Sequence, residues 1–196
     1  YDEIQFEGNP DKLKFIDKEL DDAYHQMVLK DAIIHHKDKS QLKIVFTSIH
    51  GTSITAIPQV LKKAGYKKVF IVKEQEKPDG DFPTVASPNP EEREALNLAV
   101  KLADQKKADI VLGTDPDSDR LGVVIRDLNN KPYYLNGNQI MVVLMEYILS
   151  KKQLNAKQFI ASTIVSTPMI EMIAKAHKIQ YKSCLTGFKW IARLIE

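Results

Sequence analysis

The residues best suited to chemistry are three aspartates at alternate positions, Asp115, Asp117 and Asp119, which Arg120 follows directly. Three carboxylates this close repel one another, so the segment favours a bound cation. A set of oxygen ligands indicates magnesium, calcium or manganese rather than zinc or copper. Alternate side chains of an extended strand lie about 6–7 Å apart, whereas Mg²⁺ holds its oxygens at about 2.0–2.1 Å. The segment must therefore curl so that the three carboxylates converge on one ion.

Arg120 adds a planar fork of N–H donors, which suits a pair of phosphate oxygens. The acidic cluster and this arginine together predict a divalent metal beside a phosphoryl group. The alternative interpretation is a solvated acidic turn with an incidental arginine.

Two other kinds of acidic loop were compared with this segment. An EF-hand loop that began at Asp115 would need Gly at its sixth position and Glu at its twelfth, where the chain has Arg120 and Arg126. A phosphatase of the haloacid-dehalogenase type also has two aspartates after a strand, and the first is its nucleophile. In that family Thr or Val usually stands where this chain has Asp119. A phosphatase with Asp115 as nucleophile stays open as the alternative enzyme.

Two apolar runs, 109–112 and 121–125, flank the acidic segment and predict short buried strands. Pro116 and Ser118 predict a turn between them. A second turn, 47–53, joins an upstream strand to a helix and carries hydroxyls and a glycine. It could offer backbone N–H groups to an anion, or simply cap the helix.

Strand and helix patterns alternate along the whole chain. We expect further strands at 43–46, 69–72, 132–134, 159–165 and 179–181, and helices that begin near residues 9, 89, 138, 167 and 186. A helix is also expected between Pro58, which would delay or kink it, and Gly65, which would end it. His35 and His36 are adjacent, and adjacent helix positions point apart, so no metal site is predicted there.

This alternation predicts an α/β fold with a mixed, mostly parallel sheet covered by helices. An incomplete second unit of the same kind follows, and we place the domain boundary near Leu135. The expected domains are therefore residues 1–134, which contain the metal-binding loop, and residues 135–196. The chain starts without Met and stops inside an apolar helical pattern, so we expect a fragment of a longer protein.

The composition indicates an ordinary soluble protein, with 43% hydrophobic and 28% charged residues. A net charge of +2 gives no indication of a nucleic-acid partner. The longest apolar run, 140–149, contains Glu146 and is too short to span a bilayer. The single cysteine, Cys184, excludes an internal disulfide and suits a reducing compartment. We therefore expect a cytoplasmic protein with no nucleic-acid or membrane partner.

Residues 115–120, Asp-Pro-Asp-Ser-Asp-Arg, resemble the magnesium loop of the α-D-phosphohexomutases, the phosphoglucomutase and phosphomannomutase enzymes. Other segments resemble further motifs of this family in the same order. They are His50-Gly51-Thr52, Phe82-Pro83-Thr84, Pro88-Asn89-Pro90-Glu91-Glu92, Leu135-Asn136-Gly137-Asn138-Gln139 and Thr186-Gly187-Phe188-Lys189-Trp190-Ile191. The resemblance extends from about Lys43 to the end and is greatest to the phosphoglucomutase and phosphopentomutase branch.

The resemblance implies four domains around a cleft, of which this chain has the second and the beginning of the third. The family's phosphoserine loop, sugar-binding loop and distal phosphate loop have no counterpart here. The resemblance therefore implies that domains I and IV of the same chain are missing and that the fragment alone is inactive. It implies a phosphosugar substrate, but the selection between glucose, mannose and pentose lies outside the sequence.

The family's reaction passes a phosphoryl group from phosphoserine to a sugar phosphate and back through a bisphosphate, which also activates the full enzyme. The resemblance implies that Asp115, Asp117 and Asp119 hold Mg²⁺, with Mn²⁺ as a substitute. It implies that Arg120 contacts the transferred phosphoryl group or the bound substrate, and that Lys189 is a cation on the substrate side of the cleft. A non-enzymatic module that binds metal or phosphosugar stays open as a further alternative.

Overall fold

The structure is a computed structural model that describes residues 8–16, 18–32, 39–152, 155 and 158–196. His35 and His36 lie outside these residues. Within the described part, no helix combines the length and the apolar character needed to cross a membrane.

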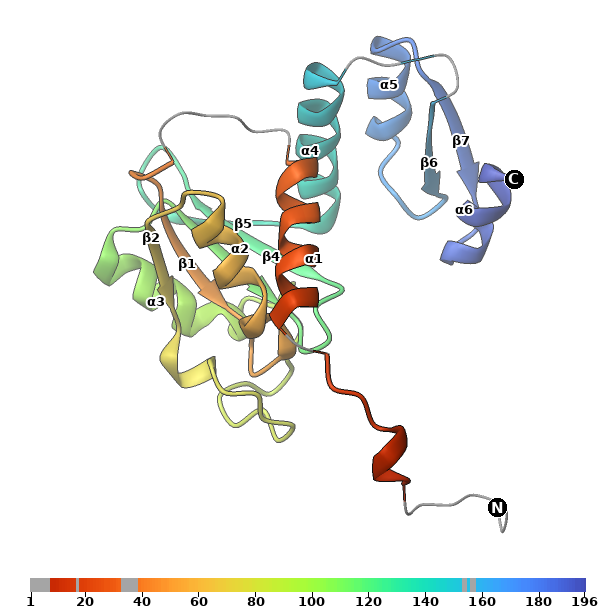
Figure 1. The fold of residues 1–196 in the computed structure, drawn as a ribbon. Coiled ribbons are helices and arrows are strands. Elements are labelled where there is room, and N and C mark those ends of the chain that lie inside the picture. The colour runs from red at the N-terminus through yellow and green to blue at the C-terminus, as the bar shows by residue number, and fades with distance from the viewer. Residues whose placement is uncertain (1–7, 17, 33–38, 153–154, 156–157) are drawn as a thin grey trace.

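A five-stranded mixed sheet forms the first unit, in the order β2-β1-β3-β4-β5 (Figure 1). β1 pairs in parallel with β2 and β3, whereas β4 pairs antiparallel with both β3 and β5. The strands are β1 (Lys43–Thr47), β2 (Lys68–Ile71), β3 (Ile110–Thr114), β4 (Leu121–Arg126) and β5 (Pro132–Leu135). The predicted α/β class with a mixed sheet is confirmed.

Helices cover both faces of this sheet, as right-handed crossovers require. The crossover from β1 to β2 contains α2 (Ile57–Lys63), and the crossover from β2 to β3 contains α3 (Asn97–Lys106). These crossovers run in opposite directions along the sheet, so the right-handed rule places their helices on opposite faces. α3 packs against β1 and β3, while α2 packs against β2 and contacts α1 (Lys18–Asp31).

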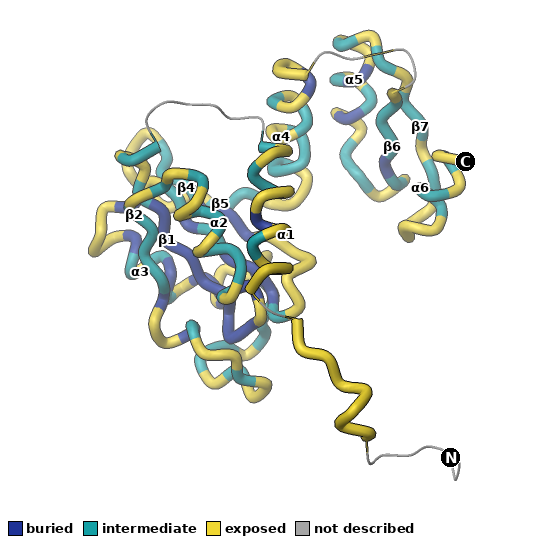
Figure 2. The backbone as a smooth tube through the Cα atoms, viewed as in Figure 1, coloured by how far each residue is buried: buried dark blue, intermediate teal, exposed yellow. Residues whose placement is uncertain are grey.

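The core of the first unit lies between the sheet and α3 (Figure 2). Its fully buried side chains include Val45, Ile49 and Val72 from the sheet side and Leu96 and Ala99 from the helix side. Gly113 in β3 leaves room for the side chain of Leu96, in the 3₁₀ turn before α3, because a Cβ there would lie 2.4 Å from Leu96 Cδ2.

Two predicted helix starts are wrong. Asn9 caps only a 3₁₀ turn, Pro10–Lys12, and α1 begins at Lys18, because Leu13 is already extended (φ −83°, ψ 117°). Asn89 accepts a hydrogen bond from the Glu91 N–H, but the chain forms a turn there, and the helix follows a 3₁₀ segment to begin at Asn97.

The second unit contains a two-stranded parallel sheet of β6 (Phe159–Thr163) and β7 (Gln180–Cys184). Its helices are α4 (Gly137–Lys151), α5 (Met169–Ala176) and α6 (Phe188–Ile195). α4 begins with a reciprocal capping box in which Asn136 and Gln139 bond each other's backbone. Strand β6 ends two residues earlier than predicted, and β7 extends three residues further.

Candidate metal centre

The acidic segment is the connection between the antiparallel strands β3 and β4. Asp115 directly follows β3 and Arg120 directly precedes β4. The Asp115 carboxylate closes the loop by accepting a hydrogen bond from the Arg120 N–H at 2.9 Å. Ser118 adopts a left-handed conformation (φ 67°), and its N–H donates to the Asp115 carbonyl at 3.1 Å. The predicted turn is therefore a tight, internally hydrogen-bonded loop.

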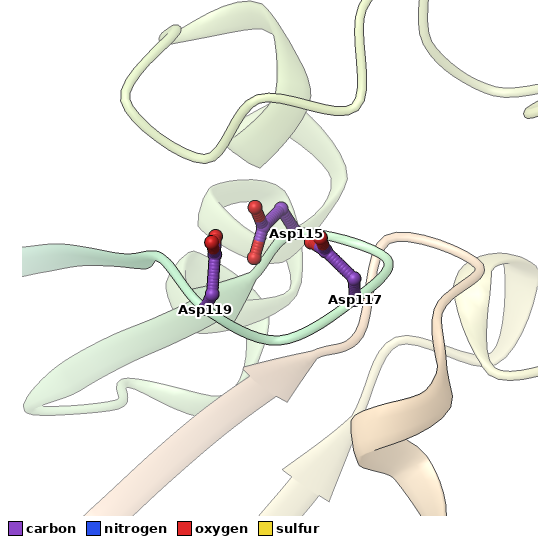
Figure 3. A group of neighbouring side chains, drawn as sticks. All are labelled: Asp115, Asp117 and Asp119. Carbon is purple, nitrogen blue, oxygen red and sulfur yellow. The ribbon is translucent and has the colours of Figure 1, made fainter. Parts of the chain in front are cut away.

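This curvature brings the three predicted carboxylates together. One oxygen from each of Asp115, Asp117 and Asp119 lies within 4.8 Å of the other two. All three side chains point to the same side of the loop (Figure 3). In an octahedral Mg²⁺ shell, adjacent oxygens lie about 2.9 Å apart and opposite oxygens about 4.1 Å apart. The carboxylates would therefore move closer together to hold a hard divalent cation.

The three carboxylates are negatively charged, so they repel one another and attract a cation. Asp115 is buried, whereas Asp117 and Asp119 are exposed. A hydrogen bond with Asp115 and the negative charges of Asp117 and Asp115 raise the pKa of Asp119, and the positive charge of Arg120 only partly opposes this. A bound divalent cation would relieve this repulsion.

The Arg120 guanidinium stands beside the cluster. Its Nε lies 3.7 Å from Asp115 Oδ2 and 3.8 Å from Asp119 Oδ1, and 58% of the side chain is exposed. Both separations are longer than a hydrogen bond, so the N–H fork is available to an approaching anion. Arg120 also lines a cavity of about 670 Å³ with Asp119, Glu91 and residues of α4.

Lys189 does not join this group. It is the second residue of α6, is exposed, and its Nζ lies 5.5 Å from the centre of the Trp190 ring. α6 lies at the outer side of the second unit, away from β4 (Figure 1).

The predictions from sequence missed the residues that support the acidic loop. Thr52 donates two hydrogen bonds to the Pro116 carbonyl, from its N–H at 2.9 Å and from Oγ1 at 3.1 Å. Ser53 Oγ lies 2.6 Å from Thr114 Oγ1, at the end of β3. The turn at 47–53 thus contacts the acidic loop, and the 3₁₀ turn in which it ends (Thr52–Thr55) has no side-chain cap. The sequence did contain a signal for this contact. The turn and the acidic loop each follow a predicted strand, and the carboxyl ends of neighbouring parallel strands meet at one sheet edge.

Comparison with known proteins adds the family. Residues 22–129 match the family "Phosphoglucomutase/phosphomannomutase, alpha/beta/alpha domain II", and residues 136–196 match domain III of the same proteins. A phosphoglucomutase of Staphylococcus epidermidis is 42% identical over 158 residues, which is 81% of this chain and 29% of that protein. The chain spans about a third of the length of the curated relatives that it matches.

Solved structures share the fold. A phosphoglucomutase/phosphomannomutase family protein of Burkholderia thailandensis superimposes with a TM-score of 0.72 at 21% identity, over 89% of this chain and 35% of the other. An Aspergillus fumigatus N-acetylphosphoglucosamine mutase, solved in complex with GlcNAc-6P and magnesium, gives a TM-score of 0.55 at 15% identity, over 89% and 34%. The matched domains cover more than half of the chain, which therefore belongs to the phosphoglucomutase/phosphomannomutase family.

Proposed function

We propose that this chain is the metal-binding part of a phosphoglucomutase-type enzyme, which interconverts sugar 1-phosphates and 6-phosphates (or 5-phosphates) through a phosphoserine and a bisphosphate. The observation that carries the proposal is the convergence of three carboxylates within 4.8 Å, in a chain of this family. The complex of the A. fumigatus mutase with magnesium and a sugar phosphate supports the choice of metal and substrate class.

In this proposal Asp115, Asp117 and Asp119 supply three of the six ligands of Mg²⁺ or Mn²⁺. When bound, the ion supplies Lewis-acid polarisation of a phosphoryl oxygen. Asp115 is held by the Arg120 N–H and keeps its position, whereas the two exposed aspartates adjust around it. Three carboxylates leave half of an octahedral shell to water and to groups from outside the loop.

Arg120 orients and neutralises the phosphoryl group beside the carboxylates. Its guanidinium lies close enough to the carboxylates to contact the same phosphoryl group as a metal ion held there. Its exposure leaves the N–H fork accessible. Transfer of a phosphoryl group needs little more from a protein than positioning and charge stabilisation. Lys189 is proposed as a second cation for the substrate, contributed by the other unit.

We further propose that residues 1–134 and 135–196 belong to two successive domains. The family matches support this division because one ends at residue 129 and the next begins at residue 136. The whole reaction is proposed for a longer protein that also contains domains I and IV, and a sugar bisphosphate is proposed as its activator. The chain's share of its relatives' length supports this.

The metal assignment is tested by calorimetric titration of the chain with Mg²⁺ and Mn²⁺. A triple Asp→Asn variant at 115, 117 and 119 should lose binding, whereas the exposed Asp81→Asn should titrate like the starting chain. Undiminished binding by the triple variant would refute the site.

The catalytic assignment is tested by conversion of glucose 1-phosphate with Mg²⁺ and trace glucose 1,6-bisphosphate. The 196-residue chain should show no turnover above its triple Asn variant. In the longer protein, Arg120→Ala should reduce turnover strongly, and Arg120→Lys should recover only part, because a point charge replaces a planar fork. Phosphate release by the chain alone, with a borohydride-trapped aspartyl phosphate at Asp115, would support the phosphatase instead.

A further inference from the structure

The acidic loop is held from one side by the turn that follows β1. β1 and β3 are parallel neighbours, with Thr47 paired to Gly113, so the segments after both strands meet at one sheet edge. Thr52 spans the gap there, because its N–H and its Oγ1 both donate to the Pro116 carbonyl, at 2.9 and 3.1 Å. Thr52 Oγ1 also lies 3.4 Å from Ser118 Oγ.

Gly51 makes this approach possible by lacking a side chain. A Cβ at this position would lie 2.4 Å from Pro116 Cα and 2.7 Å from Pro116 O, and both are backbone atoms that cannot move aside cheaply. The backbone of Gly51 (φ −102°, ψ −174°) is open to any residue. The Ser48 carbonyl oxygen, in the same turn, would lie 2.8 Å from this Cβ. The glycine is therefore required by the close approach of Pro116 and Ser48 and not by its own φ and ψ angles.

The turn itself is fixed from beneath by buried hydrogen bonds. Ile49 and His50 both adopt positive φ angles, 46° and 60°, which a β-branched residue adopts only when its surroundings impose it. The His50 N–H donates to the Gln75 carbonyl at 3.0 Å, and the His50 ring contacts Thr84 Oγ1 at 2.9 Å. The turn that contacts the acidic loop is thus itself held by hydrogen bonds to the segment after β2.

We propose that Gly51 and Thr52 are positioning residues for the metal, because they fix the peptide between two of its ligands. Pro116 is the residue between Asp115 and Asp117, so a shift of its carbonyl would move the backbone that carries both carboxylates. Mutual repulsion drives them apart when no cation is bound, and the contact with Thr52 opposes this movement. The inference rests on the metal site of the proposed function and adds to it residues outside the acidic loop.

The test is Mn²⁺ binding to the 196-residue chain, followed by the electron paramagnetic resonance signal of free Mn²⁺. Thr52→Val removes both Oγ1 contacts but keeps the shape, and it should weaken binding roughly five-fold, the equilibrium equivalent of about one net hydrogen bond. Thr52→Ser keeps the hydroxyl and should stay within about two-fold of the starting chain. Gly51→Ala should weaken binding more than Thr52→Val does, because it displaces the Pro116 backbone.

Thr55→Val is the matched control. Thr55 is exposed in the same 3₁₀ turn (Thr52–Thr55) and donates to the Thr52 carbonyl, with no hydrogen bond to the acidic loop. Its Mn²⁺ affinity should be unchanged. Thermal unfolding of every variant, followed by circular dichroism, separates positioning from folding, because a purely structural role would lower the melting temperature and leave the affinity of the folded chain unchanged.

The outcomes separate this inference from the proposed function. If the triple Asp→Asn chain loses Mn²⁺ while Thr52→Val binds like the starting chain, the positioning role is refuted and the metal site stands. If the triple variant binds undiminished, the metal site and the positioning role both fail. If Gly51→Ala does not fold, Thr52→Val and Thr52→Ser still decide.

Discussion

Gln75 is the residue whose replacement tests most directly how the turn after β1 is built. It belongs to the loop that follows β2, and its fully buried side chain connects β1 to a later part of the same loop. Thr47 Oγ1 donates to Gln75 Oε1 at 2.6 Å, and Gln75 Nε2 donates to Thr84 Oγ1 at 3.0 Å. Gln75→Leu keeps most of the volume and removes both hydrogen bonds.

The cost can be worked out from what each partner keeps. The Thr47 hydroxyl is fully buried and loses the acceptor of its proton, which costs about 1–3 kcal/mol. The Thr84 hydroxyl keeps its contact with His50 Nε2 at 2.9 Å and loses only about 0.5–1.5 kcal/mol. Gln75→Leu should therefore lower the free energy of unfolding by roughly 1.5–4.5 kcal/mol.

Urea unfolding of the chain, followed by far-ultraviolet circular dichroism, measures this loss. Gln59→Leu is the control, because Gln59 is exposed on α2 and bonds only the Thr55 carbonyl among described groups; it should stay within about 0.5 kcal/mol. Adding Thr47→Val should cost less on the Gln75→Leu background than on the starting chain, because the unpaired hydroxyl is then gone. A Gln75→Leu loss below about 0.5 kcal/mol would refute the assigned hydrogen bonds.

Three further predictions concern other parts of the chain. Gly122→Ala should destabilise by about 1–3 kcal/mol in thermal unfolding, because its Cβ would lie 2.3 Å from the Pro90 carbonyl oxygen, whereas Gly80→Ala, with nothing within 4 Å, should be neutral. Only the ionised carboxylate binds metal, so the raised pKa of Asp119 should make Mn²⁺ affinity begin to fall, as the pH is lowered, at a higher pH than an ordinary aspartate would cause. A pH series in which the affinity falls only at the ordinary aspartate pKa would contradict this. Hydrogen bonds from lysines on α1 and α2 lower the pKa of Asp22 to about 2, so their stabilising effect is present above the ordinary aspartate pKa and is lost as the pH falls towards 2. Asp22→Asn should therefore speed amide hydrogen exchange in α1 at neutral pH, and unchanged rates would argue against the contact.

The sequence alone predicted the acidic cluster and its immediate flanks. Asp115, Asp117, Asp119 and Arg120 are consecutive or alternate, so a single local turn brings them together. The apolar runs on either side gave the two strands, because hydrophobic spacing is itself a local property. The α/β class followed from the same kind of local pattern, the alternation of strand and helix segments.

The two helix starts that failed show where local signals stop. Asn9 and Asn89 are both cap residues followed by proline. In both places the asparagine side chain accepts the expected hydrogen bond from a backbone N–H. The helix does not follow, because a cap satisfies one N–H while packing decides whether the next turns form. Pro90 illustrates this, since it is fully buried and its carbonyl lies against Gly122 in β4.

Only the tertiary structure decided which residues support the acidic loop. Thr52 lies more than sixty positions before Pro116, and it reaches that carbonyl because β1 and β3 are parallel neighbours that end at the same edge. The need for glycine at Gly51 is partly non-local, since Pro116 of the other loop excludes a side chain there together with the Ser48 carbonyl of its own turn. Residue spacing along a chain predicts contacts within one turn or strand. The contacts that hold this loop depend on which strands are neighbours in the sheet, and residue spacing does not give that order.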